Sequence, residues 1–448
     1  MLDTKYKTPK GLELSGLNLN NSEVGQEAWW QEVKSLGTPL TTPVDKDTKR
    51  LTFLWRDPDG DQRQSKIQKV YIDVYSVTDH HQLDITSLTR ITGTDVWYWQ
   101  VDVESSMQAS YFLVPCTEKH LLKHQEQENI KLAHRRWWRQ LIQSRAVSDP
   151  LNNSASHASS WGGELSSFNL SPTWFDELWI SDAVSKIKKQ TNKRTKLINW
   201  SSRVLQKNRQ VWLYSTAHDG AIKQSSIPLV VLLDGEYWAQ QLPLTAGLQE
   251  LTDNGKLAAA NYLFIDAVDG FTRNEELACN QQFWQALEAE LLPILEELYE
   301  VKHDPEQTLL IGQSLGGLAA VYATLTQPSL ARKAISISGS FWWPDHELAS
   351  KRGRLTSTQT NIGSVNQMLA LNEQHGLPIQ AYLSVGKYED MMIDVNEQVA
   401  ANLRHHQVSV TQTLFNGGHD WICWRNEIIH GLIALLSPDS NKQEHNHE

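Results

Sequence analysis

The chain contains little cysteine for its length. Three cysteines, Cys116, Cys279 and Cys423, occur among 448 residues. An odd number of cysteines without metal-ligand spacing indicates neither a disulfide framework nor a zinc site. Sparse, scattered cysteines are typical of a reducing compartment.

The chain also lacks long apolar runs. Residues 1–16 have none of the apolar core that a secretory leader carries, and no later run reaches the length of a membrane span. We therefore expect a soluble, cytoplasmic protein with no membrane partner.

The chain has fewer basic than acidic side chains. The chain has 41 Lys and Arg against 52 Asp and Glu, which gives a formal net charge of −11 at pH 7. This balance argues against a nucleic-acid partner. The sequence carries no signal for an oligomeric state.

A chain of this length exceeds what one compact core usually holds, so two domains are expected. Between residues 50 and 115, short alternating runs rich in aromatic and β-branched residues are separated by turn signals. Together with a helical stretch at 117–145, they predict an all-β, immunoglobulin-like sandwich domain over residues 1–150. The following segment is rich in Ser, Asn and Gly, so residues 151–195 are expected to be a linker.

Strand-like and helix-like segments alternate over residues 196–440, which predicts an α/β domain with a mostly parallel sheet and helices on both faces. The strand-like runs are almost continuously apolar, as expected for strands buried on both faces. The expected strands lie at 211–215, 228–235, 261–270, 308–312, 333–339, 380–386 and 409–418, and the expected helices at about 276–300, 315–326 and 391–406.

One segment of this domain carries the signature of a nucleophile. The strand-like run at 308–311 leads into Gly312-Gln313-Ser314-Leu315-Gly316, after which the spacing becomes helical. A Gly-x-Ser-x-Gly pattern at a sharp strand-to-helix turn is how α/β-hydrolases expose a catalytic serine. Side chains at the two glycine positions would collide with the adjacent strand and helix. The sequence therefore predicts Ser314 as the nucleophile of an α/β-hydrolase domain.

A serine nucleophile needs a base and an orienting acid, which follow it in α/β-hydrolases in the order acid, then histidine. His419 comes directly after the Gly-Gly turn that ends the last expected strand, so it is the predicted base. Glu389 and Asp390 both follow the strand that ends at Gly386. Glu389 is the preferred acid, and Asp390 remains the alternative.

The predicted oxyanion hole has two backbone donors. One is the N–H of Leu315, at the start of the new helix. The second is expected from the loop after the strand at 228–235, where Gly235, Glu236 and Tyr237 are the candidates. Asp234 precedes the serine and is expected to hold the turn.

Three residues beside the predicted site bear on the substrate. Arg273 follows a strand end on the same edge of the sheet, where it would pair either with an anionic substrate or with Glu276. Trp342 and Trp343 follow another strand end. They would either stack on a ring-bearing ligand or pack against a lid.

These residues together resemble the cytoplasmic enterochelin (enterobactin) esterases, which cleave the ester bonds of ferric catecholate siderophores. The resemblance covers most of the chain. In the N-terminal part it depends on Phe53-Leu54-Trp55-Arg56-Asp57-Pro58, Tyr111-Phe112-Leu113-Val114-Pro115 and Asp149-Pro150-Leu151-Asn152. In the C-terminal part it depends on Leu232-Leu233-Asp234-Gly235, Arg273 with Glu276-Leu277, Gly312-Gln313-Ser314-Leu315-Gly316-Gly317, Ser338-Gly339-Ser340 with Trp342-Trp343, and Gly417-Gly418-His419-Asp420 with Cys423-Trp424-Arg425.

The resemblance implies a β-sandwich that helps to hold a bulky substrate and a hydrolase domain that carries Ser314 and His419. The family's acid maps to Glu389, although Asp390 stands where the family more commonly has proline. The implied substrate is a ferric catecholate siderophore, a trianion with flat rings. The iron would arrive with this substrate, so no cofactor and no protein-bound metal are expected.

Two other functions are compatible with the same residues. The first is a feruloyl or acetyl-carbohydrate esterase whose N-terminal sandwich binds sugar. The second is a siderophore-binding protein on a hydrolase scaffold that has lost its activity.

Overall fold

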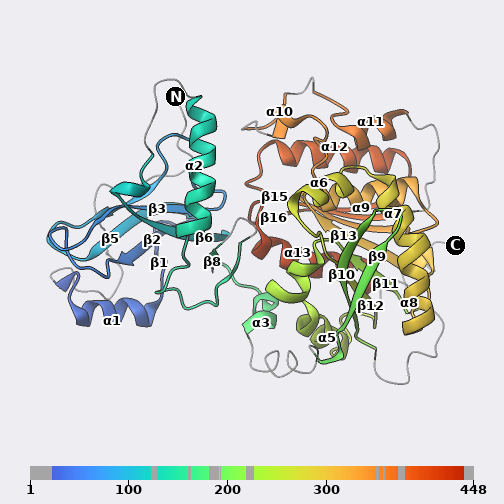
Figure 1. Cartoon of the computed structure of the whole chain (residues 1–448), viewed down its shortest axis with the longest axis horizontal. Coiled ribbons are helices and arrows are strands. Elements are labelled where there is room, and N and C mark those ends of the chain that lie inside the picture. The colour runs from blue at the N-terminus through green and yellow to red at the C-terminus, as the bar shows by residue number, and fades with distance from the viewer. Residues whose placement is uncertain are drawn as a thin grey trace. The chain divides into compact units, whose positions relative to one another are not determined.

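The structure, a computed structural model, describes residues 23–122, 129–159, 163–180, 191, 193–217, 227–349, 353–356, 359–371 and 379–437. The chain divides into two compact units, residues 1–172 and residues 173–448 (Figure 1). Among the helices in these ranges, none is long and apolar enough to cross a membrane.

The first unit contains one antiparallel sheet of eight strands in the order β1-β2-β5-β4-β3-β6-β8-β7. Its strands are β1 (Leu40–Pro43), β2 (Thr48–Arg56), β3 (Ile67–Val74), β4 (Ser87–Arg90), β5 (Val96–Glu104), β6 (Gln108–Thr117), β7 (His157–Ala158) and β8 (Glu164–Asn169). Its helices are α1 (Glu27–Leu36), the short 3₁₀ turn η2 (Glu118–His120) and α2 (Ile130–Arg145).

This sheet folds over on itself. The ring of Phe53 on β2 lies 4.9 Å from that of Tyr111 on β6 and 6.3 Å from that of Phe168 on β8. In the strand order, β5, β4 and β3 lie between β2 and β6. The two ends of the sheet must therefore face each other across an aromatic core.

The expected linker at 151–195 is corrected by the structure. Strand β8 pairs with β6 and places Leu165 in the apolar core of the first unit. Helix α3 (Trp174–Ile180) belongs to the second unit, where Leu178 is buried. The Ser- and Asn-rich composition conceals β8 because only two of its six residues, Leu165 and Phe168, are apolar. After α3, this segment is described only at 191 and 193–195.

The second unit contains a mixed sheet of eight strands in the order β16-β15-β14-β13-β11-β12-β10-β9. The strands from β16 to β12 run parallel, whereas β10 is antiparallel to both β12 and β9. The strands are β9 (Lys196–Ser202), β10 (Lys207–Ser215), β11 (Leu229–Leu232), β12 (Asn261–Ile265), β13 (Thr308–Gln313), β14 (Lys333–Ile337), β15 (Gln380–Gly386) and β16 (Ser409–Phe415).

Helices connect these strands. They are η4 (Tyr237–Gln241) and η5 (Leu287–Leu291), both π-helical, the 3₁₀ turn η6 (Pro305–Gln307), and α5 (Thr245–Asp253), α6 (Gly270–Leu277), α7 (Gln281–Ala286), α8 (Leu292–Tyr299), α9 (Leu315–Thr326), α10 (His346–Ala349), α11 (Ser364–Leu371), α12 (Met391–His405) and α13 (Trp421–Leu436). The helix expected at about 276–300 is thus divided among several elements. One break lies at Cys279, whose φ of 57° is left-handed.

Successive strand residues are buried on opposite faces of this sheet. Val231 packs in one apolar cluster with residues of α7, α8, α9 and α12, and Leu232 packs in another with residues of α5 and α13. This alternation follows from the period of two in a β-strand. The prediction of a sheet covered on both faces is confirmed.

The parallel strands bring several loops to one edge of the sheet. Strand β13 pairs with β11 on one side and β14 on the other, and β15 pairs with β14 and β16. Because parallel strands end at the same edge, the loops after these five strands meet there.

Candidate active site

Ser314 lies at a sharp turn between β13 and α9. Its φ of 56° and ψ of −121° are unusual for a residue with a side chain. A Cβ on Gly312 would overlap the backbone of Gly316, so the turn requires glycine there. The backbone N–H of Ser314 donates to the carbonyl oxygen of Ile337 at 3.0 Å, which ties the turn to β14.

His419 and Glu389 complete a chain of hydrogen bonds that begins at this serine. His419 Nε2 lies 3.0 Å from Ser314 Oγ, and His419 Nδ1 lies 2.6 Å from Glu389 Oε2. The side chain of Glu389 is 2% exposed, whereas that of His419 is 44% exposed. The structure therefore brings together the predicted nucleophile, base and preferred acid, with the acid buried and the base open to solvent.

Glu389 is held on its other oxygen. Oε1 accepts hydrogen bonds from Ser338 Oγ at 2.6 Å and from the N–H of Gly386 at 2.8 Å. Trp424 Nε1 in turn donates to Ser338 Oγ at 3.0 Å. Asp390 instead lies at the N-terminus of α12 with a φ of 48°. The contact with His419 is thus made by Glu389 and not by Asp390.

Ser338 was not predicted as a site residue. It follows β14, which lies between the strands that carry Ser314 and Glu389, and its backbone φ of 49° is also left-handed. The sequence signal for Ser338 is a hydroxyl directly after β14, the strand between those that lead to Ser314 and Glu389.

The loop after β11 contains the three candidates for the second oxyanion donor, and the structure excludes one of them. The backbone N–H of Tyr237 donates to the carbonyl oxygen of Asp234 at 3.0 Å, so it is not available to a substrate. The Tyr237 ring stacks on Trp421, with the centroids 3.8 Å apart. Gly235 and Glu236 remain as sources of the second donor. Leu315, the other predicted donor, is the first residue of α9.

The side chain of Glu236 is an unexpected acidic group beside this loop. It accepts a hydrogen bond from the backbone N–H of Ala267 at 3.0 Å. Burial, and to a lesser extent the negative charge of Asp234, raise the pKa of Glu236 from 4.5 to about 7.

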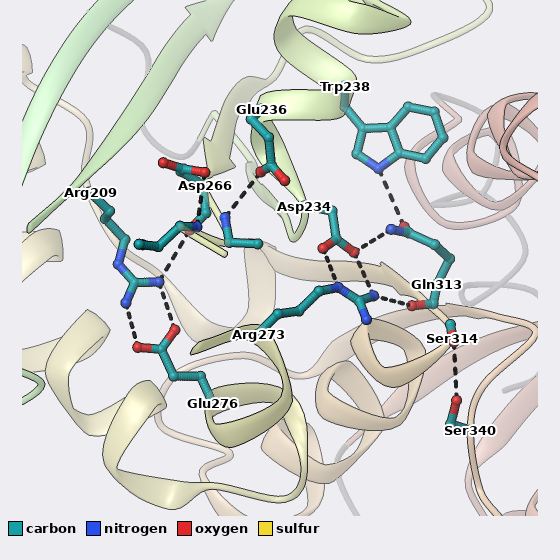
Figure 2. Close-up of polar contacts among 12 residues, drawn as sticks. Arg209, Asp234, Glu236, Trp238, Asp266, Arg273, Glu276, Gln313, Ser314 and Ser340 are labelled. Carbon is teal, nitrogen blue, oxygen red and sulfur yellow. Dashed lines mark hydrogen bonds and ion pairs between the residues drawn. The ribbon is translucent and has the colours of Figure 1, made fainter. Parts of the chain in front are cut away.

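Arg273 does not pair with Glu276, which was one of its two predicted partners. Figure 2 shows the guanidinium of Arg273 against the carboxylate of Asp234, with Nε 2.5 Å from Oδ1 and Nη2 2.8 Å from Oδ2. Glu276 instead forms a buried ion pair with Arg209. Asp234, which was expected only to hold the turn, thus also forms an ion pair with Arg273 that the sequence did not predict.

Trp342 and Trp343 are half-buried and pack against the core of the second unit. Their ring centroids are 6.1 Å apart, and the Trp343 ring meets His346 edge-on at 4.8 Å. A second aromatic group lies next to the base, because the ring of Trp424 meets His419 edge-on at 4.6 Å.

Arg425 is a cation without a carboxylate partner among the described residues. Its guanidinium lies 4.4 Å from the ring centroid of Trp179, and its Nε is buried without a hydrogen bond in the described part of the chain. Burial lowers the pKa of Arg425 to about 9, although the nearby charge of Asp176 acts in the opposite direction. Asp176 accepts hydrogen bonds from Thr173 and Asn426.

No metal site is formed by the residues that the structure describes: they contain no group of three or more His, Cys, Asp or Glu side chains that could hold an ion. The three cysteines are free thiols.

Comparison with known proteins identifies the family. The family model described as enterochelin esterase, N-terminal, matches residues 50–179, and the model described as putative esterase matches residues 202–435. The iron(III) enterobactin esterase of Dickeya dadantii is 37% identical over 94% of this chain and 95% of its own. The chain belongs to the enterobactin esterase family. It is therefore a carboxylic ester hydrolase.

Solved structures of enterobactin esterases have the same fold. The ferric enterobactin esterase of Salmonella typhimurium gives a TM-score of 0.78 at 31% identity, covering 93% of this chain and all of that one. The Shigella flexneri enzyme, solved in the presence of enterobactin, gives a TM-score of 0.76 at 32% identity, covering 92% and 98%. The family resemblance predicted from the sequence is confirmed.

The contact between Glu389 and His419 predicts which acid supports catalysis. Glu389→Gln should lower kcat by about 10³ to 10⁴, because the histidine loses the charge that orients it and stabilises its protonated form. Asp390→Asn should change kcat by less than about threefold. Hydrolysis of p-nitrophenyl acetate by the two purified variants measures both effects, and the opposite ranking would assign the role to Asp390.

The raised pKa of Glu236 predicts a pH-dependent stability. Because the pKa is higher in the folded state, folding favours the neutral acid. This contribution is complete below about pH 4.5 and is lost as the pH rises through about 7. Glu236→Gln removes the ionisation, so its stability relative to the parent should increase over this range.

Urea denaturation at a series of pH values measures this difference. Glu297→Gln, on the exposed side of α8, is the matched control, and its curve should run parallel to that of the parent protein. A parallel curve for Glu236→Gln as well would contradict the prediction.

Proposed function

We propose that this chain is a serine esterase that hydrolyses the trilactone ester bonds of ferric enterobactin or a similar catecholate siderophore. The observation that carries the proposal is the continuous chain of hydrogen bonds Ser314–His419–Glu389 on the fold of the enterobactin esterases. Two relatives that are 37% and 34% identical over most of this chain are named iron(III) enterobactin esterase. One that is 27% identical over 91% of the chain, from Escherichia coli, is named iron(III) salmochelin esterase. This favours a siderophore ester over the sugar esters of the first alternative.

The proposed mechanism is acyl transfer in two stages. His419 Nε2 takes the proton of Ser314 Oγ as the serine attacks an ester carbonyl, and Glu389 stabilises the resulting imidazolium. The oxyanion accepts hydrogen bonds from Leu315 and from Gly235 or Glu236. His419 then protonates the leaving alcohol. A water molecule, deprotonated by His419, releases the acyl group from Ser314.

Repeated cycles would open the ring and then shorten the linear product. The first cleavage opens the ring and leaves the three catecholates in one molecule. Each later cleavage lowers the number of catecholates per molecule, which weakens iron binding and helps to release the iron. The iron in this proposal is part of the substrate, and the protein needs no cofactor of its own. We place the reaction in the cytoplasm, in keeping with three free thiols.

We also propose that the first unit is an immunoglobulin-like sandwich and the second an α/β-hydrolase domain. The contact of Phe53 with Tyr111 across the folded sheet supports the first assignment. The serine at the turn from β13 to α9 supports the second.

The substrate would be an anion with flat rings, so the site needs cations and aromatic surfaces. Trp342 and Trp343 remain our candidates for stacking. Arg425 is the better candidate for a cation than Arg273, because Arg273 already forms an ion pair with Asp234. Arg425 lies on Trp179 and forms no ion pair with a carboxylate in the part of the chain that the structure describes. A desolvated cation of this kind gains most from a charged ligand.

Chromatographic analysis of the products tests the proposed function. Incubation of the protein with ferric enterobactin should yield the linear trimer and shorter fragments, and Ser314→Ala should lower the rate at least about 10³-fold. Turnover of a feruloylated sugar alone would overturn the proposal. Full use of ferric enterobactin by cells that carry only Ser314→Ala would instead favour a binding protein.

The role of Arg425 predicts a selective effect on binding. Arg425→Met keeps much of the side-chain volume and removes the charge, so KM for ferric enterobactin should rise about 10- to 100-fold. KM for the neutral ester p-nitrophenyl acetate should stay unchanged. Arg404→Met, at an exposed position on α12, is the control and should leave both values unchanged. An equal change for both substrates would contradict a role in anion binding.

A further inference from the structure

A network of polar side chains joins the loop after β11 to the turn that carries the serine. Arg273 forms two hydrogen bonds to Asp234, and Gln313 Nε2 donates to Asp234 Oδ2 (Figure 2). Arg273 Nη2 also lies 3.4 Å from the carbonyl oxygen of Gln313. Trp238 Nε1 donates to Gln313 Oε1 at 3.3 Å. The Asp234 carboxylate and the Gln313 side-chain amide thus connect three parts of the chain: helix α6, the loop after β11 and the turn that carries Ser314.

Two residues of this network lie directly beside Ser314 or a candidate oxyanion donor in the chain. Gln313 directly precedes Ser314, and Asp234 directly precedes Gly235 and Glu236, the two remaining candidates for the second oxyanion donor. The other donor, Leu315, follows the serine. An oxyanion hole works only when both N–H groups point to the same place, and these two come from loops after different strands.

The backbone at Asp234 requires such support. Its φ of 54° is left-handed, which is costly for a residue with a side chain. Gly235 packs so closely on β12 that a Cβ would overlap the backbone of Ile265 and Phe264. The ion pair and the bond from Gln313 hold Asp234 in this conformation from two sides.

We propose that Arg273 is a positioning residue: through Asp234 and Gln313 it sets the second oxyanion donor against Ser314. This inference rests on the proposed catalytic role of Ser314. Asp234 is 3% exposed and Arg273 is 21% exposed, so the charge of Arg273 is directed mainly to a buried carboxylate. This role accounts for the pairing of Arg273 with Asp234, a carboxylate of the protein, at the edge of the sheet where the substrate is expected.

A second ion pair close by provides a matched control. Arg209 and Glu276 are also buried, with 1% and 4% of their side chains exposed. Arg209 bonds to Glu276 and to the backbone of Asp266, away from Gln313 and Ser314 (Figure 2). Lysine at either arginine position keeps the charge and loses the paired geometry, so the comparison separates the effect of the contacts to Asp234 and Gln313 from the loss of a buried ion pair.

The test compares Arg273→Lys and Arg209→Lys on a neutral and a charged ester. For Arg273→Lys, kcat should fall about 10- to 100-fold on both p-nitrophenyl acetate and ferric enterobactin, with each KM within about threefold of the parent value. Arg209→Lys should keep kcat within about twofold, even where its urea midpoint is lower. In Arg273→Ala, millimolar methylguanidinium should restore part of kcat.

Three results would overturn the inference. A rise in KM for ferric enterobactin with unchanged hydrolysis of the neutral ester would make Arg273 a substrate-binding residue. An equal loss of kcat in Arg209→Lys would show a general effect of stability. Parent-like kcat in Arg273→Lys and Arg273→Ala would show that the network is not needed. In each case the parent protein keeps its Ser314-dependent activity, so the result contradicts the positioning role of Arg273 and leaves the proposed function in place. Absence of Ser314-dependent activity in the parent protein would contradict the proposed function as well.

Discussion

Parallel hydrogen bonding between β11, β13, β14 and β15 is the constraint on which the rest of the site depends. It fixes the order in which four loops meet at one edge of the sheet. The serine, the hydroxyl that supports the acid, and the acid itself follow three adjacent strands. A shift of one residue in any of these pairings would reverse which face each side chain occupies and separate the groups.

The site combines strained backbone with dense hydrogen bonding. Ser314, Ser338, Asp234 and Asp390 all have left-handed φ values, and each lies just after a strand or before a helix at this edge. Such conformations persist only where the surroundings hold them. The bonds around Glu389 and Asp234 supply that support, so the polar networks stabilise a backbone that would otherwise relax.

Much of the site could be predicted from sequence because each of its main residues follows a strand end in a known order. Ser314 has a motif with a steric reason, and His419 and Glu389 follow it in the required order. Arg273 was placed at the correct edge but given the wrong protein partner, because a pair 39 residues apart depends on how helix α6 meets the loop after β11. The composition of β8 resembles that of a loop, and only its pairing with β6 shows that it is a strand.

His419, the proposed base, lies 105 residues after Ser314, the proposed nucleophile, in the chain. During synthesis the serine and its turn therefore emerge well before the histidine proposed to activate them. A nascent chain passes through a long stage in which it holds the proposed nucleophile without its base, and Glu389 emerges in between. The order of these residues thus delays ester hydrolysis until nearly all of the second unit has left the ribosome.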